Sequence, residues 1–170
     1  LYKGFAADGI TPRYFMMHFS REWFGGWTIE DTTNWYELTE EEYALGVDKD
    51  QPELLEKVNE FIERIQEDGT YDEILNRYFG DGEPQAVVSA QFDADKDQLI
   101  VATNAAFEPF EYTKGESYYG IDMEIAAALA EHLGKELVIM NMDFDAVCLS
   151  VGQQKCDIAM AGLTIKEDRK

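Results

Sequence analysis

The chain has 170 residues, enough to bury roughly 70% of the surface that its unfolded form exposes, so one domain is the expected organisation. Its composition, 45% hydrophobic and 13% aromatic, is that of a soluble globular protein. Its net charge of −21 comes from 35 acidic and 14 basic residues, and such a surface repels phosphate backbones and anionic lipid. Nucleic-acid binding and a membrane-surface role are therefore not expected, and the acidity is typical of a highly soluble surface.

The sequence contains neither a bilayer-spanning run of about 20 apolar residues nor a signal-peptide pattern at its start, which does not exclude export. Its two cysteines, Cys148 and Cys156, occupy positions with an apolar pattern, so we predict buried free thiols, with a disulfide as the alternative. No His/Cys cluster surrounds them, and neither a metal site nor a cofactor is expected.

Residues 1–37 are rich in aromatic side chains and have no clean periodicity. Part of the stretch could form an amphipathic helix, but Gly25-Gly26 interrupts it, and we leave it unassigned. His18 lies among these aromatics and is interpreted as a packed residue without a catalytic role.

From residue 38 the pattern becomes regular. Residues 43–47 predict a short buried strand, and an amphipathic helix follows, with Pro52 in its first turn and Asp50 as its N-cap. Gly69 ends this helix, and Thr70 with Glu73 predicts a capping box for a second helix that stops at Gly80. Residues 81–97 lose the periodicity and are interpreted as a linker, with a weak strand at 86–88.

Residues 98–170 alternate strand and helix. Strands are expected at 99–103, 136–140 and 156–161, and helices at 121–133 and 144–152. This alternation predicts an α/β fold, a single lobe with a mostly parallel sheet and helices on both faces. Ligands of such sheets bind at the carboxyl ends of the strands, which here are residues 104–107, 141–144 and 161–164.

The side chains at these strand ends are of the types that bind a free amino acid as a ligand. An arginine grips a carboxylate through two parallel hydrogen bonds, a threonine hydroxyl and backbone N–H groups add donors, and two phenyl rings can flank a side chain. Each residue also has a plainer interpretation: the phenylalanines as core, the arginine as a surface residue, the asparagine as a turn residue. The predicted ligand-binding set is Asn104, Phe107, Phe144, Gly162, Thr164 and Arg169.

Two segments of this half resemble a known family. Residues 99–112, which contain Asn104-Ala105-Ala106-Phe107-Glu108-Pro109-Phe110, are similar to the opening strand and loop of bacterial polar-amino-acid solute-binding proteins. Residues 119–124, Phe144 and the run from Gly162 to Arg169 fit the same pattern. Residues 38–80 resemble the family's final segment, a strand followed by two helices.

The resemblance implies a type II periplasmic-binding-protein fold: a two-lobed clamp outside the cytoplasm, lipid-anchored in the parent protein, that delivers a polar L-amino acid to the permease of an ABC importer. It implies that Arg169 binds the α-carboxylate with Thr164 and the backbone of Gly162, and that Phe107 and Phe144 flank the side chain. Asn104 stands where the family often has an acidic residue near the ligand. Asp122 is interpreted mainly as a helix cap.

The two family-like segments occur in reverse order. A fragment across two tandem binding domains, joined by residues 81–97, is the favoured explanation, and a permuted chain or a natural single lobe are the others. Residues 1–37 would then be a remnant of the second lobe, and the clamp would be incomplete. We expect residues 43–47 to join the sheet of the same chain, with a swapped homodimer as the alternative.

The favoured function is therefore a non-catalytic amino-acid-binding component of an ABC uptake system. The first alternative is an enzyme on the same scaffold, because dehydratases of aromatic amino-acid biosynthesis resemble these proteins. It would need a positioned acid or base, and Glu108, Glu111 and Asp143 form no convincing pair in the sequence, while His132 lies off the predicted site. The second is an extracellular ligand-sensing domain.

Overall fold

The computed structural model of the chain describes residues 2–5, 12–15 and 43–164. The chain divides into two compact units, residues 1–42 and 43–170. In the first unit, strands β1 (Tyr2–Phe5) and β2 (Pro12–Phe15) pair antiparallel. The described part of the unassigned aromatic segment is thus a pair of strands, and His18 lies outside the described residues.

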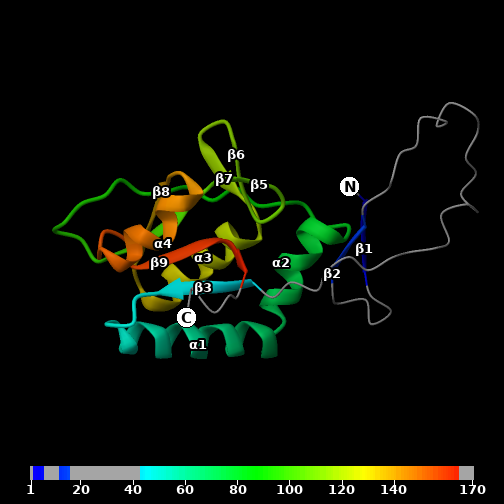
Figure 1. The fold of residues 1–170 in the computed structure, drawn as a ribbon. Coiled ribbons are helices and arrows are strands. Elements are labelled where there is room, and N and C mark those ends of the chain that lie inside the picture. Colours follow the sequence, from blue (N-terminus) through cyan, green and yellow to red (C-terminus); the bar gives the residue numbers. More distant parts are fainter. Residues whose placement is uncertain (1, 6–11, 16–42, 165–170) are drawn as a thin grey trace, which may run out of the picture. The chain divides into compact units, whose positions relative to one another are not determined.

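A mixed sheet forms the centre of the second unit (Figure 1). Its strands are β3 (Tyr43–Val47), β4 (Gln98–Thr103), β8 (Glu136–Asn141) and β9 (Ile158–Thr164), in the order β3-β9-β4-β8. β4 lies between β8 and β9 and runs parallel to both, whereas β3 is antiparallel to β9. The α/β class and the mostly parallel sheet predicted from the sequence are confirmed.

The strand at residues 43–47 differs from its prediction in one respect. It was expected to be buried, but β3 is half exposed, because it lies at the edge of the sheet beside β9. It joins the sheet by pairing antiparallel with β9. The pairing shifts register between Gly46↔Ala159 and Ala44↔Leu163, so β9 bulges over residues 160–162.

Helices cover both faces of this sheet. Alternate residues of β9 point to opposite sides, and Ala159, Ala161 and Leu163 pack with Val147 and Val151 of α4 (Phe144–Gly152). On the other face lies α3 (Ile121–Leu133), which is buried along most of its length. α1 (Pro52–Glu67) and α2 (Thr70–Phe79) pack against α3 and bury Phe61, Ile65 and Ile74.

Both predicted N-caps of these helices are displaced by one residue. The N-cap of α1 is Gln51, not Asp50, and Pro52 takes the first helical position. The N-cap of α2 is Gly69 in a left-handed conformation, so Thr70 is already helical, and the carboxylate of Asp68 accepts the Thr70 N–H at 2.9 Å. Acidic side chains two residues upstream, rather than capping boxes, thus satisfy backbone donors at these turns.

Residues 81–97, which the sequence indicates as a linker, bond to several other elements of the unit. Val87, at the centre of the predicted weak strand, forms an isolated antiparallel bridge with Tyr118 and is buried against Met123 and Ile139. Further along, the N–H of Ala90 donates to the carbonyl of Leu137 at 2.8 Å, and the Ser89 hydroxyl accepts the Ile139 N–H at 2.8 Å.

A buried carboxylate joins the two family-like segments. Glu124 of α3 is 5% exposed and accepts hydrogen bonds from Arg77 and Tyr78 of α2, both at 2.5 Å, and from the Gln85 N–H at 2.9 Å. The Tyr78 hydroxyl in turn accepts the Gly120 N–H at 2.9 Å. Residues from both segments and from the stretch between them therefore meet at one side chain.

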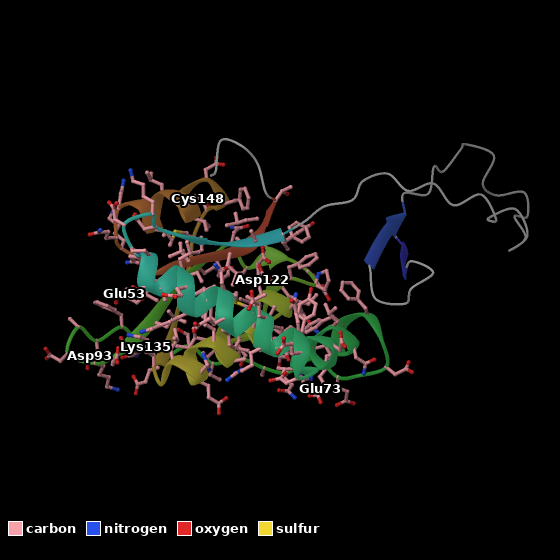
Figure 2. All side chains as sticks on the ribbon, turned by 90° about the horizontal axis from the view of Figure 1, so that it is seen from below. Glu53, Glu73, Asp93, Asp122, Lys135 and Cys148 are labelled. Carbon is pink, nitrogen blue, oxygen red and sulfur yellow. The ribbon has the colours of Figure 1, made fainter. Side chains whose placement is uncertain are left out.

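The cysteines follow their prediction only in part. Both are free, as expected, but Cys156 alone is buried, at 3.6 Å from the sulfur of Met140. Cys148 is exposed, because it lies on the outer face of α4 (Figure 2). In the ranges that the structure describes, no helix combines the length and the apolar character that crossing a bilayer requires.

Candidate functional site

The loop after β4 carries the first predicted ring. It forms a small antiparallel sheet of β5 (Ala106–Phe107), β6 (Glu111–Lys114) and β7 (Ser117–Tyr119). The Phe107 ring stacks on Phe110 with ring centroids 5.3 Å apart, and Phe110 contacts the edge of Tyr43. Phe107 nevertheless remains 45% exposed, which favours a ring available at the surface over the core interpretation.

Gly162 of β9 meets Phe107 directly. A Cβ at this position would lie 2.9 Å from Cε1 of the Phe107 ring, so no larger residue fits without moving the ring. The φ angle of Gly162 is +53°, in the left-handed region that glycine tolerates best. Two of the predicted site residues, from different strand ends, are thus in contact, as expected for neighbouring parallel strands.

The remaining predicted residues take the following places. Phe144 begins α4 directly after the loop that follows β8 and is 42% exposed. Thr164 is the last residue of β9 and is half buried. Arg169 lies outside the described residues.

Asn104 has a structural bond at the end of β4. Its side-chain N–H donates to the carbonyl of Met142 at 2.8 Å, and the Asn141 side chain reciprocally accepts the Ala105 N–H at 2.9 Å. These two bonds tie the loop after β4 to the loop after β8. Asn104 thus holds two strand ends in register, in addition to any contact with a ligand.

Asp122 is not a helix cap. Gly120 is the N-cap of α3, and Asp122 is the second helical residue. Its carboxylate, 7% exposed, accepts the Gly162 N–H at 2.9 Å and lies inside the unit, whereas Glu53, Glu73 and Asp93 lie on its outside (Figure 2). The Gly162 N–H is therefore already used, which removes it from the donors expected for a ligand carboxylate.

Glu111 lies beside the same glycine. It is 1% exposed, its Oε1 lies 3.9 Å from where a Gly162 Cβ would stand, and its Oε2 has no hydrogen-bond partner among the described residues. Burial, and then the charge of Asp122, raise the pKa of Glu111 to about 9. Burial raises the pKa of Asp122 to about 6, opposed by the bond from Gly162.

At neutral pH, Asp122 is therefore charged and Glu111 neutral. Sequence reasoning considered both residues but missed their pairing. The available signal was a glutamate placed directly between two aromatic residues, Phe110 and Tyr112.

Replacing Glu111 by glutamine is expected to stabilise the chain, increasingly as the pH rises. A carboxyl group whose pKa is raised on folding makes the free energy of unfolding fall between its unfolded and folded pKa values, here from about 4.5 to about 9. Glutamine does not titrate and removes this dependence. Urea unfolding at pH 5.5 and 8.5 measures it, with exposed Glu116→Gln as the control. An equal gain at both pH values would contradict the raised pKa.

An open surface cavity of about 580 Å³ lies elsewhere. It is formed at the start of α1 and at the amino ends of the strands, because Leu99 is the second residue of β4, Lys135 precedes β8 and Asp157 precedes β9. Parallel sheets bind ligands at their carboxyl ends, so this cavity is not part of the candidate site. His132, expected off the site, bonds to Arg64 of α1.

The chain is similar to curated proteins of two kinds. It is 35% identical over 78 residues to the arginine-binding extracellular protein ArtP of Bacillus subtilis (strain 168), covering 46% of this chain and 31% of that protein. It is 36% identical over 73 residues to a cyclohexadienyl dehydratase of Pseudomonas aeruginosa, covering 42% of this chain and 27% of that protein. The chain thus spans less than a third of the length of either relative.

Among solved structures, the arginine-bound form of domain 1 from TmArgBP is 36% identical, with a TM-score of 0.42, and the match covers 43% of this chain and 59% of that one. At the level of families, the chain matches the bacterial extracellular solute-binding proteins, family 3, over residues 6–81 and 99–170. The match reaches into the aromatic segment that sequence analysis left unassigned, and it skips residues 82–98. The chain belongs to the family 3 bacterial extracellular solute-binding proteins.

Proposed function

We propose that the chain is the amino-acid-binding part of an ABC uptake system, non-catalytic and located outside the cytoplasm, and that it carries one side of the ligand clamp. The observation that carries the proposal is the contact of Phe107 with Gly162. It joins two separate strand ends into one rim in a member of this family. The permease of the importer is the partner that this function requires.

In the proposed site, Arg169 binds the α-carboxylate, because its planar fork matches the two oxygens, and Thr164 adds a hydroxyl donor. Phe107 and Phe144, both about half exposed, offer apolar faces to the ligand side chain. Since the Gly162 N–H bonds to Asp122, the part of Gly162 left for the ligand is its carbonyl oxygen. Asn104 sits at the same rim.

Arginine is the first ligand to test. Several similar proteins carry arginine binding in their names, and a net charge of −21 attracts a cationic ligand. Asn104 carries no charge, so the acidic partner of a cationic ligand side chain would have to be another residue. Other polar amino acids are therefore tested beside arginine.

We further propose that the chain is an incomplete clamp in which the closing segment, residues 38–80, precedes the opening segment, residues 98–170. Two separate family matches flank an unmatched stretch, which supports a junction of tandem domains or a permutation. In the structure β3 pairs with β9 of the same chain, which is the arrangement that closure within one chain requires. A solution mass that corresponds only to a tight dimer would contradict closure within one chain.

Calorimetric titration of the full chain with the common amino acids tests this function. We expect binding weaker than micromolar, because an incomplete clamp lacks opposing contacts and leaves the ligand solvated. We expect Arg169→Ala to abolish it, and exposed Lys155→Ala to leave it unchanged. Micromolar binding by a monomer would contradict the incomplete clamp, and unchanged binding by Arg169→Ala would remove this arginine from the site.

The enzyme alternative has one specific observation in its favour, a buried neutral carboxyl at the strand ends, and a dehydratase is among the similar proteins. However, Glu111 is 1% exposed, so its carboxyl is not open to a substrate at the surface. Turnover of a cyclohexadienyl substrate by the parent chain, lost in Glu111→Gln, would favour the enzyme.

A further inference from the structure

Gly162 lies in a part of β9 that is not paired with a neighbouring strand. β9 pairs with β4 at Ile158 and Ala159, and with β3 at Ile158, Ala159, Leu163 and Thr164, so residues 160–162 form the bulge between the paired stretches. A bulged backbone loses ladder bonds and needs other partners. In this chain the missing acceptor for Gly162 comes from a helix, since the Asp122 carboxylate accepts its N–H.

Two carboxyl groups therefore approach one glycine from two elements. Asp122 comes from α3 and Glu111 from β6, and both are more than nine-tenths buried. The Glu111 carboxyl has an Oε2 without a hydrogen-bond partner in the described part of the chain. Like charges this close in a buried site repel strongly, so the pair is most stable with one negative charge and one proton.

Gly162 meets the Phe107 ring and the Glu111 carboxyl on the same side, because Cε1 of Phe107 lies 2.9 Å and Oε1 of Glu111 lies 3.9 Å from where its Cβ would stand. Its missing Cβ leaves room for the Phe107 ring, and its left-handed conformation is maintained by the bond to Asp122. A change in the backbone at Gly162 would therefore shift the contact with the Phe107 ring and also Thr164, which lies two residues further along β9.

We propose that Asp122 and Glu111 are positioning residues of the ligand site, which together fix the Gly162 backbone against Phe107 before the ligand arrives. The inference rests on the proposed amino-acid binding, and it assigns to these acids no contact with the ligand. The charged Asp122 supplies the acceptor, and the neutral Glu111 fills the remaining space without a second charge.

One further titratable group interacts with this pair. Tyr71 of α2 has its pKa raised, first by burial and then by the charge of Asp122, so it stays neutral over the range in which the acids titrate. At pH 7 the pair is in its working state. Below about pH 6 Asp122 loses its charge, and above about pH 9 Glu111 gains one.

The test uses the full chain and a readout that needs no ligand. The amide resonance of Gly162, followed by nuclear magnetic resonance, should shift with a midpoint near pH 6 because its hydrogen donates to the Asp122 carboxylate. Asp122→Asn should remove this titration and weaken arginine binding by about tenfold or more at pH 7, the size of a lost bond to a charged acceptor. Asp95→Asn, at an exposed acid, is the control.

A second variant separates positioning from folding. Glu111→Gln should bind as the parent does at pH 7, because Glu111 is neutral there, but should outperform the parent at pH 9.5, where the parent carries two charges. The ratio of the two affinities at each pH cancels the titration of the ligand's own amino group. Equal affinities of Asp122→Asn and parent, or a ratio that does not change with pH, would overturn the inference.

Failure of the proposed function remains distinguishable from failure of the inference. A parent chain that binds no amino acid overturns the function and, with it, the ligand-directed part of the inference. A Gly162 amide that does not respond to Asp122 overturns the inference even when arginine binds.

Discussion

Gly120→Ala is expected to lower the free energy of unfolding of the chain by about 4 kcal/mol or more. A Cβ on Gly120 would lie 2.0 Å from the carbonyl oxygen of Phe110 and 2.4 Å from its carbon. That carbonyl accepts the Asp122 N–H at 2.9 Å, so the clash falls on the backbone that joins the loop after β4 to the start of α3. Urea unfolding followed by circular dichroism measures the loss.

The matched control is Gly115→Ala. Gly115 also has a positive φ, +63°, but its Cβ would meet nothing within 4 Å. The conformational cost alone, about 1–2 kcal/mol, is therefore expected there. Similar losses for the two variants would show that left-handed strain, rather than the approach of Phe110, determines the effect at Gly120.

Glu124→Ala is expected to cost about 3–5 kcal/mol, because it removes one partner of a buried ion pair and leaves other donors unsatisfied. Arg77, Tyr78 and the Gln85 N–H all donate to this carboxylate. Burial and Glu124 hold the pKa of Tyr78 well above its usual range, so its hydroxyl remains a donor. Chemical denaturation at pH 7 gives the free energy.

Glu131→Ala on the same helix serves as the control, since Glu131 is exposed, and it should change stability by less than about 0.5 kcal/mol. Glu124→Gln should fall between the two, because it keeps the shape and one acceptor but loses the charge. A loss below about 1 kcal/mol for Glu124→Ala would mean that the closing and opening segments are held together mainly by apolar packing.

The sequence was a good guide to elements and a poorer one to their ends. The strands β4 and β8 and the helices α1 to α4 follow from hydrophobic periodicity, which burial enforces along a whole element. The caps at Asp50 and Thr70 were wrong because a nearby acid two residues upstream competed for the same backbone donors. The burial of β3 was overestimated because five apolar residues do not reveal whether a strand lies at an edge.

The sequence also predicted part of the candidate site. The contact of Phe107 with Gly162 follows from the rule that carboxyl ends of neighbouring parallel strands share an edge. The roles of Asp122 and Glu111 did not follow, because their pairing depends on how a helix start and a hairpin approach β9, and no local pattern encodes that distance. The packed stretch from Val87 to Ala90 was hidden for the same reason, since its partners come 30 residues or more later in the chain.

The stretch at Ser89 and Ala90, which bonds to β8, has a consequence for handling the protein. Its bonds to Leu137 and Ile139 occupy backbone groups at the edge of β8 with which another chain could otherwise pair. A shortened chain that starts at Leu99 would keep β4, β8 and β9 but would lose β3, α1 and α2 together with this stretch, which uncovers both edges of the sheet. Such a truncation should self-associate and precipitate at concentrations at which the longer chain stays in solution.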